Sequence, residues 1–292
     1  MLQQTTVAAV VPRFERFTAR WPTIEALAAA KDEEVLSEWA GLGYYARARN
    51  LIACARDVVG RGGFPRSAQA LRSLPGIGEY TSAAIAAIAF GEDAPAVDTN
   101  VERVISRLHA LERPGRGEIG RLLKAITPTG KSGDLAQALM DLGATICRPK
   151  APQCNACPIS ADCAAFASGA PERFPLPKPR ARRPVRFGLA YWIEQDDRLW
   201  LVRRPAKGLL GGMAALPGSE WADERLPDMG SHIVRHVFTH FALELGLERR
   251  SAPVGDGWWQ PLTSIGEAGL PTLYRKAVSA MQAARAQPRR AA

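Results

Sequence analysis

The chain has 292 residues, 47% of them hydrophobic, and a formal net charge of +9 at pH 7. This apolar content is ordinary for a globular protein with a packed core, and the length is typical of two domains. The charge favours an anionic partner, with nucleic acid ahead of a membrane surface, and a generic basic protein is the alternative.

Neither a signal peptide nor a membrane span is evident. The N-terminus lacks a basic segment followed by an apolar one, and the longest Ala-rich apolar run, residues 83–90, is too short to cross a bilayer. We therefore expect a soluble, cytoplasmic protein. In that compartment the five cysteines argue against a disulfide framework.

The first segment, MLQQTTV, is typical of the inside of a helix, because apolar residues recur at helical spacing and no capping residue precedes them. Residues 1–168 as a whole predict helices separated by Gly and Pro. Two helix faces stand out, Ala84, Ile85, Ile88 and Ala89 with Gly91 as a stop, and Val101, Val104, Ile105 and Leu108.

The stretch LPGIGEYTSAAIAAIAF (74–90) predicts two helices joined by a tight turn, the first ending near Ser73 and the second beginning by Thr81. Gly76 and Gly78 let the backbone of the turn approach a ligand closely. The N–H groups at the start of the second helix form an anion site, and the natural anion for a basic protein is a DNA phosphate.

Asp98, in AVDTNVERVISRL (96–108), stands where a helix N-cap belongs, and it can be a cap and nothing more. The helix N-terminus also favours the ionised carboxylate. An ionised carboxylate suits a positive transition state, such as the oxocarbenium ion of glycosidic cleavage. Removal of a base would then need a second group as the acid.

Four of the five cysteines, Cys147, Cys154, Cys157 and Cys163, lie within seventeen residues at the spacing C-x6-C-x2-C-x5-C. Thiolates hold both tetrahedral zinc and iron–sulfur clusters. Zinc sites usually come as two short-spaced pairs far apart in sequence. One short pair flanked by single cysteines favours a [4Fe–4S] cluster over zinc. Four cysteines without a metal are the least favoured interpretation.

Arg148 and Lys150 lie in the loop between the first two of these cysteines. If a cluster ties this loop down, the two cations can be presented to phosphate, and otherwise they belong to a solvated loop. Cys54, by contrast, stands alone in a helical pattern and is typical of a packed core residue.

The character of the sequence changes after residue 170. PERFPLPKPRARRP (171–184) holds five Pro and five Lys or Arg, and it predicts a semi-rigid basic linker without helix or sheet. Apolar runs typical of strands follow at 187–193, 199–202 and 234–245, which predict an α+β domain from about 185 to 280. The basic end, RAQPRRAA, is expected to be disordered.

Together, LPGIGEYT, the Asp98 motif and the four-cysteine loop resemble the helix-hairpin-helix DNA glycosylases that carry an iron–sulfur cluster. Among these glycosylases, the adenine DNA glycosylases are the group that MLQQTTV and GLGYYARARNL (41–51) resemble. The adenine DNA glycosylases remove adenine mispaired with 8-oxoguanine or guanine. The resemblance covers nearly the whole chain. It implies a multidomain fold: an all-α helix-hairpin-helix glycosylase domain with the cluster loop (1–168), a linker (169–185), an α+β Nudix-like 8-oxoguanine recognition domain (186–282) and a tail (283–292).

The resemblance also assigns roles to single residues. It implies that Gln4 and Tyr44 wedge into the duplex near the 8-oxoguanine, one to hydrogen-bond and one to replace stacking that is lost when a base is flipped. For Tyr44 the alternative is ordinary core packing. It further implies DNA contacts at Gln3, Gly76, Gly78, Arg148 and Lys150, a catalytic Asp98, and a [4Fe–4S] cluster on Cys147, Cys154, Cys157 and Cys163.

Tyr80 bears on the type of reaction. Bifunctional relatives such as endonuclease III look similar in this stretch but place a Lys at this position. A Lys can form a Schiff base with the sugar, whereas a Tyr cannot. The resemblance therefore implies a monofunctional hydrolase with Tyr80 in its catalytic site, which removes the base without efficient strand cleavage.

LWLVRRPAKGLLGGMAALPG (199–218) resembles a Nudix fold, but the following SEWADERLPDMGSH lacks the Glu-rich R-E-x-x-E-E run that holds magnesium in Nudix hydrolases. This favours recognition over hydrolysis. RHVFTHF (235–241) matches the family's 8-oxoguanine-reading loop, with Phe238, Thr239 and His240 where the family often shows Phe-Ser-His. Thr keeps the hydroxyl, so we expect reading to survive; an edge strand with a satisfied His is the alternative.

The family places its general acid, a Glu, two residues before the Met of M-L-Q-Q-T, and this Glu, the helix before it and part of the adenine pocket have no counterpart in the chain. General acid–base catalysis contributes roughly 10²–10⁴-fold. We therefore expect a monomer that binds double-stranded DNA with an A:8-oxoguanine or A:G mispair but releases adenine very slowly in a single-turnover assay. The favoured interpretation is a glycosylase whose true start lies upstream. The alternatives are a truncated lesion-binding protein without activity and a thymine- or uracil-removing relative.

Overall fold

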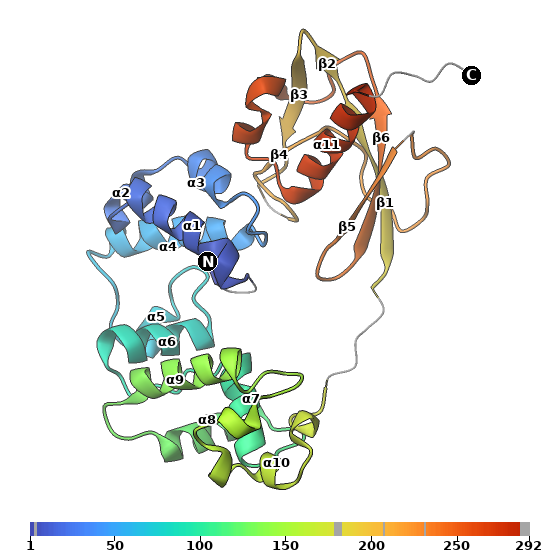
Figure 1. Cartoon of the computed structure of the whole chain (residues 1–292). Coiled ribbons are helices and arrows are strands. Elements are labelled where there is room, and N and C mark those ends of the chain that lie inside the picture. The colour runs from blue at the N-terminus through green and yellow to red at the C-terminus, as the bar shows by residue number, and fades with distance from the viewer. Residues whose placement is uncertain (3–4, 178–182, 207, 231, 287–292) are drawn as a thin grey trace. The chain divides into compact units, whose positions relative to one another are not determined.

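The computed structural model describes residues 1–2, 5–177, 183–206, 208–230 and 232–286. The chain divides into two compact units, one of residues 1–59 with 181–292 and one of residues 60–180. The first unit combines N-terminal helices with two β-sheets and a C-terminal helix, and the second is built from helices (Figure 1). None of the helices in the described ranges is long and apolar enough to cross a membrane.

The first unit begins with α1 (Val7–Arg20), α2 (Ile24–Ala29), α3 (Asp32–Trp39) and α4 (Ala46–Gly60). The expectation that MLQQTTV already lies inside a helix is wrong, because Thr6 is the extended N-cap residue of α1. Before it, the N–H of Thr5 donates to the carbonyl of Leu2 at 3.2 Å. Two consecutive β-branched threonines disfavour an earlier helical start.

Two sheets follow in the same unit. β1 (Val185–Trp192) pairs in parallel with β6 (Ala242–Arg249), which pairs antiparallel with β5 (His232–Val237). The second sheet centres on β3 (Arg198–Arg203), which is antiparallel to β2 (Glu194–Gln195), β4 (Ala214–Ala215) and β7 (Gly257–Pro261). The predicted strands near 187–193 and 199–202 are confirmed. The predicted run 234–245 is split into β5 and β6 by a turn, in which the N–H of Phe238 donates to the carbonyl of Phe241 at 2.8 Å.

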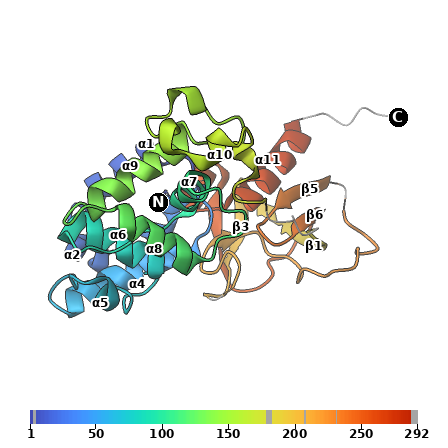
Figure 2. The same cartoon turned by 90° about the horizontal axis from the view of Figure 1, so that it is seen from below.

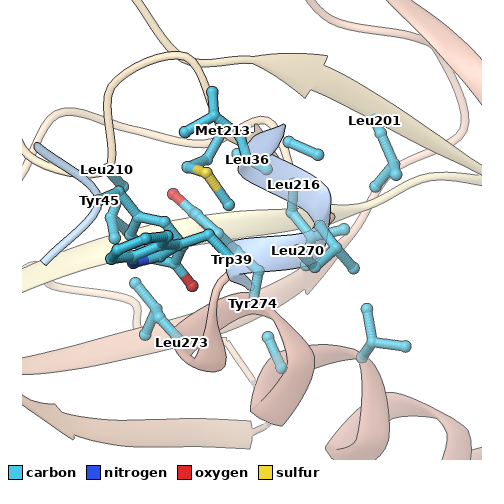
Figure 3. Packing of buried hydrophobic residues seen from close by; sticks show 14 of the residues in the cluster. Leu36, Trp39, Tyr45, Leu201, Leu210, Met213, Leu216, Leu270, Leu273 and Tyr274 are labelled. Carbon is cyan, nitrogen blue, oxygen red and sulfur yellow. The ribbon is translucent and has the colours of Figure 1, made fainter. Parts of the chain in front are cut away.

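The core of this unit joins segments that are far apart in the sequence. Leu36 and Trp39 of α3 lie in one hydrophobic cluster with residues of the sheets and of α11 (Thr272–Ala286), which packs against β5. Figure 3 shows Trp39 among Met213, Leu216, Leu270 and Tyr274. Full burial of one such side chain contributes about 1.5–3 kcal/mol, so this cluster fixes the N-terminal helices against the β-sheet domain.

The second unit contains α5 (Ala68–Leu71), α6 (Glu79–Phe90), α7 (Thr99–Leu108), α8 (Arg116–Ile126), α9 (Ser132–Thr145) and α10 (Ala164–Ala167). α7 contacts α8, α9 and α10, and Figure 2 shows it in the middle of these helices. Its predicted apolar face is confirmed, since Val101, Val104 and Ile105 are buried with Ile119, Leu123 and Leu139. A short 3-10 helix at Pro171–Arg173 shows that the predicted linker is not free of helix.

The position of α6 is predicted well, but its buried face is not. Gly91 ends the helix with φ 71°, as expected. Ile88, however, is 46% exposed, and the buried residues lie one position away from the predicted face: Ser82, Ala83, Ala86 and Ala87. The reason lies in α9, where a Cβ on Gly133 would approach the carbonyl oxygen of Ala87 to 2.6 Å. The two helices meet through small residues, and the larger Ile88 is left outside.

Candidate active site and cysteine loop

Asp98 is the N-cap residue of α7, as its place in the sequence predicts. Its Oδ1 accepts hydrogen bonds from the N–H groups of Asn100 at 2.8 Å and Val101 at 2.7 Å. Its Oδ2 accepts a third from Nδ2 of Asn100 at 3.1 Å. Because Val101 is fully buried, the helix start is anchored in the core and the carboxylate is held in one orientation. These donors and the helix N-terminus stabilise negative charge at Asp98.

Tyr80, in the first turn of α6, lies close enough to Asp98 for electrostatic contact. Burial, and then the negative charge of Asp98, raise the pKa of the Tyr80 phenol. The phenol therefore stays neutral at neutral pH, with its OH 3.5 Å from Sδ of Met140. The structure thus brings together the two residues that the sequence assigns to the catalytic site.

A chain of hydrogen bonds that sequence reasoning missed connects Asp98 to the cysteine loop. Arg103 of α7 donates from one Nη to Oδ1 of Asn100 at 2.8 Å and to the carbonyl of Gly143 at 2.7 Å. Its Nε donates to the carbonyl of Cys147 at 2.8 Å. Gly143 permits this approach, since a Cβ there would lie 2.6 Å from Cβ of Asn100.

Arg107, one turn further along α7, is a second contact that was missed. The side chain is buried, and one Nη lies 3.3 Å from Sγ of Cys147. The guanidinium also donates to the carbonyls of Arg148 at 2.8 Å, Pro149 at 3.1 Å and Phe174 at 3.0 Å. The sequence could have indicated this contact, because Arg107 comes shortly after Val104 and Ile105 of the apolar helix face.

The four cysteines of the loop lie close to one another. Burial, and then the charges of Cys147 and Cys163, raise the pKa of the Cys154 thiol, to which Cys157 adds a smaller effect. Among the described residues, no three His, Cys, Asp or Glu side chains converge closely enough to hold a single metal ion. In the same loop Arg148 donates to the carbonyl of Ala151 at 3.1 Å, and Lys150 is exposed.

The predicted tight turn before α6 is confirmed. Gly76 has φ 75°, and the N–H of Ile77 donates to the carbonyl of Leu74 at 3.1 Å. α6 begins at Glu79, two residues earlier than expected, with Gly78 at its N-cap. A Cβ on Gly78 would have no atom within 4 Å, so the space beside this helix start is open to a ligand.

The other unit contains a second group of predicted residues. Tyr44 is 46% exposed at φ 47°, which excludes ordinary core packing, and its buried neighbour is Tyr45. The hydroxyl of Thr239 donates to the hydroxyl of Tyr44 at 3.1 Å. The first residues of the predicted reading loop, 235–237, belong to β5, an edge strand of its sheet, as the edge-strand alternative expects. Thr239 and His240 are exposed in the turn between β5 and β6. Gln3 and Gln4 lie outside the described residues.

The ring of Trp221, another residue that was missed, supports the turn between β5 and β6. It stacks on Phe238 with centroids 5.7 Å apart and an interplanar angle of 30°. Phe238 in turn lies 4.9 Å from the centroid of Phe241. Gly188 of β1 makes room for this ring, since a Cβ there would lie 2.5 Å from Cδ1 of Trp221.

Two family models match parts of the chain. The model described as HhH-GPD superfamily base excision DNA repair protein matches residues 1–129, and that of the NUDIX domain matches residues 188–280. Among solved structures, a thermostable thymine-DNA glycosylase is 32% identical with a TM-score of 0.52, over 57% of this chain and 80% of that one. A trapped endonuclease III–DNA covalent intermediate is 28% identical with a TM-score of 0.52, over 57% and 81%.

Curated relatives are similar to the chain over a stretch that reaches into both of the regions that the family models match. An adenine DNA glycosylase of Arabidopsis thaliana is 37% identical over 74% of this chain and 41% of its own length. An adenine DNA glycosylase of Homo sapiens is 35% identical over 76% of this chain and 50% of its own length. The chain thus spans about half the length of these curated relatives. The chain is therefore similar to the HhH-GPD superfamily base excision DNA repair proteins over residues 1–129, to the NUDIX domain over residues 188–280, and to the adenine DNA glycosylases over most of its own length.

Proposed function

We propose that the chain is a monofunctional DNA N-glycosylase that removes adenine mispaired with 8-oxoguanine or guanine from double-stranded DNA. The observation that carries the proposal is the carboxylate of Asp98, held by three hydrogen bonds at a helix start and close enough to Tyr80 to raise the pKa of its phenol. The names of the relatives support adenine as the base.

The chemistry follows from the charge of Asp98. When the N-glycosidic bond breaks, its electron pair leaves with the base and the sugar becomes positively charged. A fixed carboxylate stabilises that charge more than it stabilises the neutral ground state, which lowers the barrier. Water then adds to the sugar carbon and loses a proton, the departing adenine takes up one proton from the solvent, and an abasic site remains. Tyr80 cannot form a Schiff base with the sugar, so the strand is expected to stay intact.

DNA is the expected partner on structural grounds as well. The open start of α6 at Gly78 presents backbone N–H groups, which is the arrangement that binds phosphate at helix N-termini. The net charge of +9 favours the same anion. A similar solved structure, that of endonuclease III, is a complex with DNA.

We further propose that Cys147, Cys154, Cys157 and Cys163 hold a [4Fe–4S] cluster. Thiolates hold both zinc and iron–sulfur clusters, and zinc sites usually come as two short-spaced pairs far apart in sequence. One short pair flanked by single cysteines in one loop, with thiols near enough that they, after burial, raise the pKa of Cys154, supports the cluster. Bound there, the cluster would cross-link the loop as one rigid centre. The purified protein is expected to contain iron and acid-labile sulfide, and Cys157→Ala is expected to reduce both.

The experiment that tests the function is an assay of adenine release under single-turnover conditions. A duplex with one A:8-oxoguanine pair is incubated with the chain, and with Asp98→Asn, for times long enough to detect slow turnover. Free adenine and abasic sites are measured, and strand breaks are scored with and without alkali. We expect release from the chain, no strand break without alkali, and a loss of at least about 10² in rate for Asp98→Asn.

A binding assay with the same duplex separates the two classes of function. Asp98→Asn should bind the duplex as well as the unaltered chain does, because the carboxylate acts on the transition state. Release no faster than that of Asp98→Asn, together with selective binding of the mispair, would overturn the proposal in favour of a lesion-binding protein. Strand breaks without alkali would overturn the monofunctional assignment.

A further inference from the structure

The side chain of Arg47, in the first turn of α4, contacts the loop that carries Tyr44 and also contacts the beginning of the chain. One Nη lies 3.3 Å from the carbonyl of Leu42 and 3.4 Å from that of Gly43. The same nitrogen donates to Oγ1 of Thr5 at 3.1 Å. The other Nη donates to the carbonyl of Met1 at 2.9 Å. Arg47 therefore joins its own loop to a segment more than forty residues before it in the chain.

The same guanidinium lies against two aromatic rings. Its Cζ is 5.4 Å from the ring centroid of Trp39 and 5.4 Å from that of Tyr44. Trp39 is buried in the core and Tyr44 is exposed, so Arg47 connects the exposed ring to the fixed one. A planar guanidinium can stack on a ring and donate in its own plane at once, which an ammonium group cannot do.

The loop that Arg47 contacts has an unfavourable backbone. Gly41, Gly43 and Tyr44 all have positive φ, at 96°, 71° and 47°. For Tyr44 this conformation is costly, because it has a Cβ. Such a residue keeps this conformation only where its surroundings determine it. Besides Arg47, Nε1 of Trp39 holds the loop by donating to the carbonyl of Gly43 at 3.1 Å.

We propose that Arg47 is a positioning residue for lesion recognition: it holds Tyr44 in its exposed, left-handed conformation and aligns it with Thr239. The inference rests on the proposed function and on the insertion of Tyr44 near the mispair that the resemblance implies. Arg47 acts through Tyr44, because both of its Nη atoms are engaged by carbonyls and a hydroxyl of the protein and the guanidinium lies against the two rings.

The expected consequence is specific to the mispair. A ring that enters a duplex binds more tightly if its conformation is already set, since binding then does not have to order the loop. Loss of Arg47 should therefore weaken binding of the mispair, where Tyr44 inserts. Binding of matched DNA, where charge on the phosphates dominates, should not change.

The test is a double-mutant cycle on mispair selectivity. Affinities at one salt concentration are measured for a duplex with 2′-fluoroadenosine, which resists cleavage, opposite 8-oxoguanine and for the same duplex with a matched A:T pair. Their ratio is compared for the chain, Arg47→Lys, Arg47→Met, Tyr44→Ala and the double variant Arg47→Met with Tyr44→Ala. We expect Arg47→Met to lower the ratio about tenfold, with partial recovery in Arg47→Lys. The double variant should be no worse than Tyr44→Ala.

Arg56 provides a matched control on the same helix. It also holds loop carbonyls, donating to Ala28 and Ala30 at 3.1 Å each, but that loop carries no proposed DNA contact. Arg56→Lys should leave the ratio unchanged. Thermal unfolding of every variant separates lost folding from lost selectivity, and Arg47→Lys remains informative if Arg47→Met unfolds.

Two results would overturn the inference. One is a fall in both affinities by the same factor, which indicates a general structural role. The other is a further loss of selectivity when Arg47→Met is added to Tyr44→Ala, which shows that Arg47 does not act through the ring. If Tyr44→Ala itself leaves the ratio unchanged, the inference also fails, while adenine release and its dependence on Asp98 still test the proposed function independently.

Discussion

Nε of Arg103 donates to the carbonyl oxygen of Cys147 at 2.8 Å, which bonds the helix that begins at Asp98 to the first cysteine of the loop. Through Asn100 the same guanidinium is also connected to the carboxylate of Asp98. The orientation of a carboxylate proposed to stabilise the transition state therefore depends on a loop proposed to hold a cluster.

Arg103→Gln is expected to lower the rate of adenine release more than the affinity for the mispair. The change removes donors from the carbonyls of Gly143 and Cys147 and releases Asn100, so Asp98 loses its alignment. A hydrogen bond to a charged group contributes about 1.5–3 kcal/mol, which corresponds to a loss of roughly tenfold to a hundredfold in rate. Single-turnover rates and affinities check this, with Arg121→Gln on the exposed face of α8 as the control. Equal losses in rate and affinity would contradict it.

The phenol of Tyr80 is expected to titrate at higher pH than an ordinary tyrosine, because burial and Asp98 raise its pKa. In the unfolded chain a tyrosine titrates near ~10. Above that pH the unfolded state loses its proton first, so the contribution of Tyr80 to stability is complete below about pH 10 and is lost as pH rises through the folded pKa. Absorbance of tyrosinate, compared between the chain and Tyr80→Phe, measures this titration. Asp98→Asn should move the titration of Tyr80 to lower pH, and an unchanged titration would show that the two groups do not interact.

Trp221→Ala is expected to reduce discrimination between 8-oxoguanine and guanine opposite adenine. The change removes the ring that supports Phe238, and with it the fixed position of Thr239 in the turn between β5 and β6. Stacked aromatic pairs contribute about 0.5–1.5 kcal/mol beyond the area that they bury, which suggests a loss of several-fold. The ratio of affinities for A:8-oxoguanine and A:G duplexes is the measurement. Trp221→Phe should retain most of the discrimination, and loss of equal size in both variants would argue against support by the ring.

Gly133→Ala and Gly120→Ala are expected to change stability in opposite directions. A Cβ on Gly133 would lie 2.6 Å from the carbonyl oxygen of Ala87, whereas one on Gly120, in α8, would have no atom within 4 Å. Overpacking costs about 1–3 kcal/mol, and replacing an unobstructed helical Gly with Ala gains about 0.5–1 kcal/mol. Urea unfolding of both variants measures the two effects. A stabilised Gly133→Ala would show that α6 and α9 pack less closely than the structure indicates.

Caps, helix ends and turns could be predicted from the sequence, because they depend on residues that are neighbours in the chain. Contacts between residues far apart in the sequence could not be predicted. Asp98 as a cap, Gly91 as a helix end and the turn at Gly76 each follow from local chemistry. The buried face of α6 could not be predicted, because it depends on Gly133 more than forty residues later. The contacts of Arg103 with Cys147 likewise join residues that only the fold brings together.

The same distinction applies to the proposed lesion site. Tyr44 could be assigned from its motif, but its left-handed backbone could not. Its hydrogen bond with Thr239 joins the loop before α4 to a turn almost two hundred residues later. The roles of Arg47 and Trp221 could not be predicted from the sequence pattern around them. Arg47 contacts carbonyls of the loop before it, and Trp221 stacks on Phe238 in the turn between β5 and β6.

Trp39 buried among Met213, Leu216 and Tyr274 means that the β-sheet domain is not a detachable module. A protease that cuts within residues 171–184 should therefore leave two pieces that still elute together, because α3 stays seated in the second piece. For the same reason, a chimera in which residues 186–282 come from a relative should lose stability, because the new domain is shaped to pack against the relative's own α3. Full stability should return only when residues 32–39 are taken from the same relative. Selection then acts on these two stretches jointly, so substitutions in one are expected to be compensated in the other.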